Sequence, residues 1–201
     1  MKFTKRIFLI LIACAITTNI CAIQFRHLFI KDGLSQLSVL SIYQDKLGRM
    51  WFGTEEGINV FDGNNLTAIK TLRNIPPQNL EVRWICGDEK GNIYFQLGTS
   101  IVCIDFATQS NTVLVKKGVT TLCHHSGKIY YASRGSVYIY NIAKQSTHCM
   151  GQLTKDNIKV LHIDSRGTLW FGTHNGLFYF NKKTRRTTLS IKGAYVEYIY
   201  E

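Results

Sequence analysis

The carboxylates are the first residues to test for chemistry, because cleavage of a glycan requires paired acids or a tyrosine–histidine pair that converge on one site. The chain has 13 aspartates and glutamates, and most of them stand at turn positions. Asp45, Asp88 and Asp164 each precede a turn glycine by three residues, a spacing that suits a type I turn. No catalytic signature accompanies them. The sequence therefore predicts no catalytic residue in this segment.

Histidine and cysteine give little support for a metal site. His124 and His125 are adjacent, but spacing places no third ligand near them, so a turn beside a strand is the favoured interpretation. No Cys-x-x-Cys pattern occurs. Four cysteines lie in apolar, strand-like segments, which favours buried free thiols over the two disulfides that an exported chain would permit: Cys86, Cys103, Cys123 and Cys149. We predict no metal ligand and no cofactor.

Aromatic side chains are numerous enough to suggest a sugar-binding surface. Trp84, Tyr130 or Tyr138 would be able to stack on pyranose faces. The competing interpretation is that these rings belong to the core, where large aromatic residues are often buried. The sequence favours the core for any single ring and does not identify ligand-binding residues.

One short pattern occurs four times and organises the rest of the chain. The clear copies are residues 45–58 and 164–177, and the weaker ones are residues 88–95 and 126–135. Their turn glycines are 43, 36 and 40 residues apart: Gly48, Gly91, Gly127 and Gly167. A period near 40 in a β-rich sequence is typical of stacked four-stranded blades.

Each copy is predicted to form an antiparallel meander of four short strands joined by turns. In the second strand Trp51 and Phe52 point to opposite faces, so both faces need cover, which neighbouring blades supply. Gly53, beside the tryptophan, is expected to make room for a ring from the next blade. The fold class predicted is all-β: a β-propeller with blades at about 39–70, 82–117, 119–153 and 158–191. A fifth blade is expected to start at 194, leaving the ring incomplete.

The repeated string Asp-x-x-Gly-x-(Leu/Met)-Trp-Phe-Gly-Thr-x-x-Gly-(Ile/Leu), preceded by Asp32-Gly33-Leu34-Ser35, resembles the two-component regulator propeller repeat. The resemblance implies scaffold roles, in turns and in packing between blades, for the matching positions. These are Asp45, Gly48, Trp51, Phe52, Gly53, Thr54 and Gly57 in the first copy, Asp88, Gly91 and Tyr94 in the second, Gly127 and Tyr130 in the third, and Asp164, Gly167, Trp170, Phe171, Gly172, Thr173 and Gly176 in the fourth.

The resemblance also implies a function. Such propellers form the N-terminal periplasmic sensor of hybrid histidine kinases and detect glycans, so the segment is expected to bind an oligosaccharide or polysaccharide and to carry out no catalysis. The implied partners are the remaining blades and kinase parts of the parent chain, with a homodimer as an open alternative. Two alternatives stay open: a secreted propeller-fold carbohydrate-active enzyme, and a purely structural or protein-binding propeller.

The N-terminus has the form of an export signal. A basic start precedes an apolar run from Ile7 to Ile16, which is shorter than the roughly 20 residues of a membrane span. We therefore expect residues 1–22 to be a signal peptide, residues 23–201 to be a partial propeller in the periplasm, and the parent protein to be anchored in the inner membrane. A fragment of this kind is expected to associate when expressed alone, with Phe25–Ile30 as a strand that lacks its blade.

The net charge of +11 suggests an anionic partner. The basic residues are dispersed, however, and the densest group falls in a predicted loop: Lys182, Lys183, Arg185 and Arg186. A solvated loop is the favoured interpretation, and export argues against nucleic acid.

Overall fold

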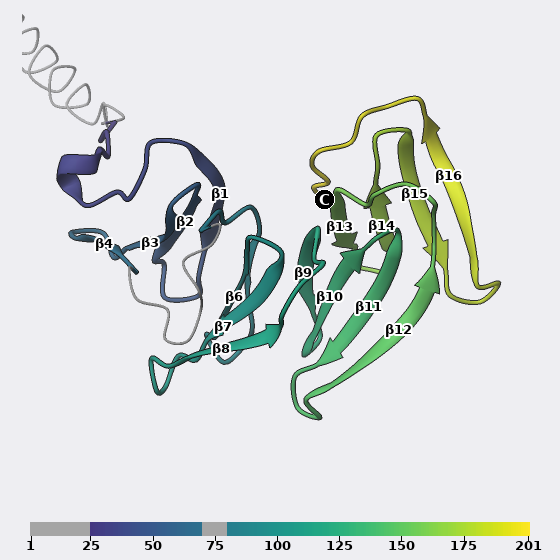
Figure 1. Ribbon diagram of the computed structural model, residues 1–201, viewed down its shortest axis with the longest axis horizontal. Helices are drawn as coiled ribbons and strands as arrows, with labels where there is room; N and C mark the ends of the chain where they lie inside the picture. The colour runs from purple at the N-terminus through teal and green to yellow at the C-terminus, as the bar shows by residue number, and fades with distance from the viewer. Residues whose placement is uncertain (1–24, 70–79) are drawn as a thin grey trace, which may run out of the picture.

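The computed structural model describes residues 25–69 and 80–201, and the predicted signal peptide lies outside this part of the chain. Four antiparallel four-stranded sheets follow one another along the sequence (Figure 1). This confirms the predicted propeller class. The first sheet contains β1 (Val39–Gln44), β2 (Met50–Thr54), β3 (Gly57–Phe61) and β4 (Leu66–Ala68). The second contains β5 (Ile85–Gly87), β6 (Ile93–Leu97), β7 (Ser100–Ile104) and β8 (Asn111–Val115).

The third and fourth sheets repeat the same meander. The third contains β9 (Thr121–His125), β10 (Lys128–Ser133), β11 (Ser136–Asn141) and β12 (Ser146–Gln152). The fourth contains β13 (Val160–Ile163), β14 (Leu169–Gly172), β15 (Gly176–Asn181) and β16 (Arg186–Lys192). The sheets stand side by side in an open arc, with the first strand of each on the inner side and the fourth on the outer side (Figure 1).

The hydrophobic core lies between the sheets rather than within any one of them. One cluster joins the first two blades around Trp51, Val82 and Phe95. A second, around Tyr94 and Tyr131, joins the second and third blades. A third cluster joins the last two blades through residues such as Ile158 and Phe171. Because β2, β6, β10 and β14 carry large groups on both faces, a single sheet would expose both of its apolar faces to water.

The strand glycines make room for a valine, not for the aromatic ring that the sequence predicted. A Cβ on Gly53 would lie 2.4 Å from the carbonyl oxygen of Val82 and 2.7 Å from its Cγ1. A Cβ on Gly172 would lie 2.6 Å from the Cβ of Val196. The valine starts the next inner segment, so its backbone passes directly over the glycine.

Two segments outside the sheets also differ from simple strands. Residues 25–29 are irregular and lead into a short 3-10 helix, Ile30–Asp32, so the predicted strand Phe25–Ile30 is wrong. The following Ser35 hydroxyl bonds Thr54 at 2.9 Å and Asn59 at 2.7 Å. Residues 194–201 form no strand, although Val196 donates its N–H to Thr173, as Val82 does to Thr54. No helix among the described residues is long and apolar enough to cross a membrane.

Candidate functional site

The repeated aspartate closes the first turn of a blade and also holds the aromatic ring of the second strand. Asp45 Oδ1 accepts the backbone N–H groups of Leu47 and Arg49, each at 3.0 Å. Asp45 Oδ2 accepts the indole N–H of Trp51 at 2.9 Å and the guanidinium N–H of Arg49 at 2.7 Å. One buried carboxylate thus shapes the turn and orients the tryptophan toward the second blade.

The same arrangement recurs in two further blades. Asp164 accepts the indole N–H of Trp170 at 3.0 Å, and Asp88 accepts the hydroxyl of Tyr94 at 2.9 Å. These contacts explain why the aspartate and the aromatic residue stand six positions apart. After the turn the second strand runs back beside the first, which brings its aromatic side chain within reach of the carboxylate.

The third blade lacks the carboxylate and uses a shorter turn. His125 pairs directly with Lys128, so only Ser126 and Gly127 connect the strands. Both have positive φ, 49° and 68°, as a type I′ hairpin requires. Tyr130 still pairs with Cys123, just as Tyr94 pairs with Cys86. The strand register is therefore kept although one turn residue is missing.

Hydrogen bonding keeps these carboxylates ionised. Burial by itself would raise the pKa of Asp164, but the N–H donors of Trp170 and Thr168 outweigh it and lower the pKa to about 2. The pKa of Asp45 is likewise lowered, since the hydrogen bonds from Trp51 and Arg49 exceed the effect of burial. These acids act as fixed hydrogen-bond acceptors for the turns, which is the scaffold role expected of the repeat.

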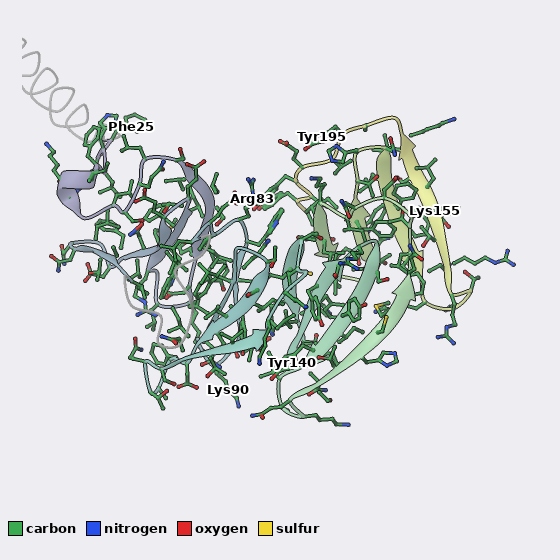
Figure 2. The ribbon with its side chains drawn as sticks, viewed as in Figure 1. Phe25, Arg83, Lys90, Tyr140, Lys155 and Tyr195 are labelled. Atoms are coloured by element: carbon green, nitrogen blue, oxygen red, sulfur yellow. The ribbon has the colours of Figure 1, made fainter. Side chains whose placement is uncertain are left out.

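A different set of side chains faces the inner side of the arc, at the rim where the blades connect. Trp84 precedes β5, is half-buried and stacks on Tyr198 with ring centroids 6.1 Å apart and planes 22° apart. Tyr198 is 72% exposed. Beside Trp84, the half-exposed Arg83 pairs with Glu81. Figure 2 shows Arg83 on this open side, where the C-terminal segment returns.

A second aromatic pair lies near the same segment. Tyr195 is 53% exposed, and its ring centroid is 4.5 Å from that of His174, in the β14–β15 turn. The neighbouring Asn175 donates its side-chain N–H to Asp156 at 2.9 Å. Exposed flat rings next to charged and amide groups form a surface that can stack on a ligand ring and bond to its polar edge.

The other residues considered from sequence fall outside this surface. Tyr130 is buried in the core, and Tyr138 stacks on Tyr131 with centroids 5.1 Å apart. The His124 ring is stacked on Tyr94, and its Nε2 lies 3.8 Å from a Glu89 carboxylate oxygen. Within residues 25–69 and 80–201, no group of three or more His, Cys, Asp or Glu side chains could hold a metal ion. All four cysteines in this part are free thiols.

Sequence reasoning missed Tyr198 and Arg83. The signal was present, because aligning Val196–Glu201 with the residues before and within β5 places Tyr198 in the position of Trp84. An alignment does not show the curvature of the arc, which brings Trp84 and Tyr198 face to face from two separate inner segments.

The comparisons with known proteins agree with this architecture. The two-component regulator propeller family matches residues 33–56 and 152–175, which hold most of the first and most of the fourth copy of the repeat. These two segments are thus similar to the two-component regulator propeller repeat. Histidine kinase P4 of Formosa agariphila is 47% identical over 51 residues, which are 25% of this chain and 4% of that protein.

Solved structures extend the likeness to the whole fold. The extracellular domain of a hybrid two-component system from B. thetaiotaomicron superposes with a TM-score of 0.65 at 16% identity, over 78% of this chain and 22% of that one. Virginiamycin B lyase from Staphylococcus aureus gives a TM-score of 0.62 at 12% identity, over 78% of this chain and 56% of that one. At these identities the similarity establishes the propeller fold alone.

Proposed function

We propose that this chain is a ligand-sensing propeller segment of an extracytoplasmic two-component receptor, and that it binds its ligand without catalysing a reaction. Three facts support the proposal: the family repeats, the local identity to a histidine kinase, and the fold shared with an extracellular domain of a hybrid two-component system. The chain spans a small part of both relatives, so the kinase activity of the parent belongs to the proposal.

The ligand class proposed is a glycan, and the observation that carries it is the Trp84–Tyr198 stack. The half-buried indole of Trp84 stacks on Tyr198, a residue that is 72% exposed. Aromatic faces of this kind suit the flat C–H face of a pyranose, and the nearby Arg83 supplies hydrogen-bond donors for hydroxyl groups.

The test is calorimetry with a panel of neutral and acidic oligosaccharides, performed on the protein as its source organism makes it. Tyr198→Ala should weaken binding of any sugar that binds by roughly tenfold, which lies within the about 1–3 kcal/mol that a nucleic-acid base gains by stacking on an aromatic side chain. Tyr200→Ala is the matched control, because Tyr200 is 90% exposed and two residues away. Absence of binding across the panel, or equal affinity of the two variants, would refute the glycan proposal.

The lyase fold similarity keeps an enzyme as the runner-up. In this chain the aspartates of three first turns accept hydrogen bonds from turn amides and from Trp51, Tyr94 and Trp170. Those carboxylates are therefore already committed to the scaffold, and the binding-module proposal is favoured.

A further inference from the structure

Charge is divided unevenly between the two halves of the propeller. Residues 25–115 hold eight lysines and arginines and nine carboxylates, whereas residues 116–201 hold 13 lysines and arginines and four carboxylates. No aspartate or glutamate occurs between Asp105 and Asp156. The third and fourth blades are therefore strongly basic while the first two are nearly neutral.

The turn between the third and fourth strand of each blade contributes to this division. In the first two blades a carboxylate caps the turn: Asp62 Oδ1 accepts the N–H of Asn64 at 2.8 Å, and Asp105 Oδ1 accepts the N–H of Thr108 at 2.8 Å. In the last two blades the side-chain amide of an asparagine accepts the corresponding hydrogen bond. Asn141 Oδ1 accepts the N–H of Lys144 at 2.9 Å, and Asn181 Oδ1 accepts the N–H of Lys183 at 3.0 Å.

The replacement removes a negative charge and keeps the turn. Hydrogen bonds from the turn amides lower the pKa of both Asp62 and Asp105, so these two caps are ionised at neutral pH. Asn141 and Asn181 preserve the geometry without that charge. The exposed cations of these two turns are Lys144, Lys182, Lys183 and Arg185, and the exposed Arg186 follows at the start of β16.

The cations gather on one rim. In a four-stranded meander the first and third turns lie at the same end of the blade, and Lys182 confirms it by donating to the carbonyl oxygen of Gly167 in the β13–β14 turn at 2.6 Å. Arg166, in that first turn, has 79% of its side chain exposed, and its Nη2 lies 3.4 Å from Asp164 Oδ2. Two carboxylates also lie at this turn: Asp164 accepts from Trp170, and Glu201 accepts from Ser165. The six cations of this end of the third and fourth blades outnumber them. Figure 1 shows the β11–β12 and β15–β16 turns as separate tips on the outer side of the arc.

We propose that this basic rim (Lys144, Arg166, Lys182, Lys183, Arg185 and Arg186) docks on the anionic headgroups of a lipid bilayer. The cations stand at the turn ends of two neighbouring blades, which suits a surface that offers charge over an area. Residues 142–145 and 182–185 contain no aromatic side chain. Chains of nucleotides are usually held by stacking on aromatic rings, so that class of polyanion fits this rim less well.

The experiment is co-sedimentation of the full chain with vesicles of phosphatidylcholine, with and without phosphatidylglycerol, as NaCl is raised. We expect binding only to the anionic vesicles, and loss of it with salt, because surface attraction is screened within a Debye length. The triple variant Lys144→Gln/Lys183→Gln/Arg186→Gln should bind roughly 100-fold more weakly, at about 1 kcal/mol per cation.

Two further variants separate the rim from net charge and from folding. Arg26→Gln/Lys31→Gln/Lys90→Gln also loses three positive charges, two from the segment before β1 and one from the second blade, and should bind as the wild type does. Asn141→Asp/Asn181→Asp gives the third and fourth blades the aspartate cap that the first two blades have. The turn hydrogen bonds are kept, so the unfolding midpoint should stay the same, and the two added negative charges should weaken vesicle binding. Equal binding to neutral vesicles, an equal loss in both triple variants, or capture by dextran sulfate without any vesicle binding would each overturn the proposal.

Discussion

Asp45 and Trp51 are joined by a 2.9 Å hydrogen bond from the indole N–H to a carboxylate that is 6% exposed. The tryptophan is 3% exposed and belongs to the cluster between the first two blades. A single contact therefore links the turn of one blade to the packing of the next. The aspartate and the tryptophan of the repeat stand six residues apart because the carboxylate must reach the indole across the turn.

This pair should be energetically coupled. Asp45→Ala leaves a buried indole N–H without a partner and should lower the free energy of unfolding by about 2–3 kcal/mol. Trp51→Phe removes the donor, and the double variant should lose less than the sum of the single variants by about 1 kcal/mol. Urea unfolding measures the cycle, with the exposed Glu56→Ala as a control expected to fall within about 0.5 kcal/mol of the wild type. Strict additivity would show that the contact is incidental.

Acid should destabilise the chain through the turn aspartates. The pKa of Asp164 falls from the ordinary 3.8 to about 2 in the folded chain. The unfolded chain thus takes up a proton first as pH drops, so the stabilisation from Asp164 is complete above pH 4 and is lost between about pH 4 and 2. Urea midpoints measured from pH 6 to pH 3 should fall, and Asp164→Asn should flatten part of that decline. An unchanged slope in this variant would contradict the role assigned to Asp164.

The close approach at Gly172 gives a third prediction. Gly172→Ala places a methyl group 2.6 Å from the Val196 Cβ and 2.7 Å from the Val160 Cγ1, so it should cost about 1–3 kcal/mol of stability. Val196→Ala removes one of the clashing side chains, and the double variant should recover part of the loss. Thermal unfolding decides between the outcomes. A Gly172→Ala chain as stable as the wild type would mean that the C-terminal segment does not pack over β14.

The four sheets could be predicted from the sequence because turn glycines and aromatic positions repeat with little variation. Other features depend on contacts between segments far apart in the chain. The neighbour of Gly53 was predicted to be an aromatic ring and is Val82, since only the three-dimensional stacking shows which residue of the next blade passes over the glycine. Phe25–Ile30 has the composition of a strand but has no paired strand, and it forms an irregular segment that leads into a 3-10 helix.

The candidate site was harder still to predict. From the sequence, the core was favoured for Trp84 because large aromatic residues are often buried. In the structure Trp84 is half-buried, and composition alone cannot separate a core ring from a rim ring. The stack with Tyr198 arises from the curvature of the arc, which brings residues 114 positions apart into contact. The curvature depends on many packing contacts between neighbouring blades, so no short sequence motif predicts it.

The last prediction concerns the thiols, which should differ sharply in reactivity. Cys149 is exposed on the outer strand β12, whereas burial raises the pKa of Cys123 to about 12 and that of Cys103 to about 11. Burial also raises the pKa of Cys86 well above its ordinary value. Since the thiolate is the reacting form, iodoacetamide should alkylate Cys149 first in the native chain. Peptide mapping by mass spectrometry reports each site, and in denatured, unreduced protein all four should be modified. Protection of any two of them after denaturation would reveal a disulfide and contradict the assignment of free thiols.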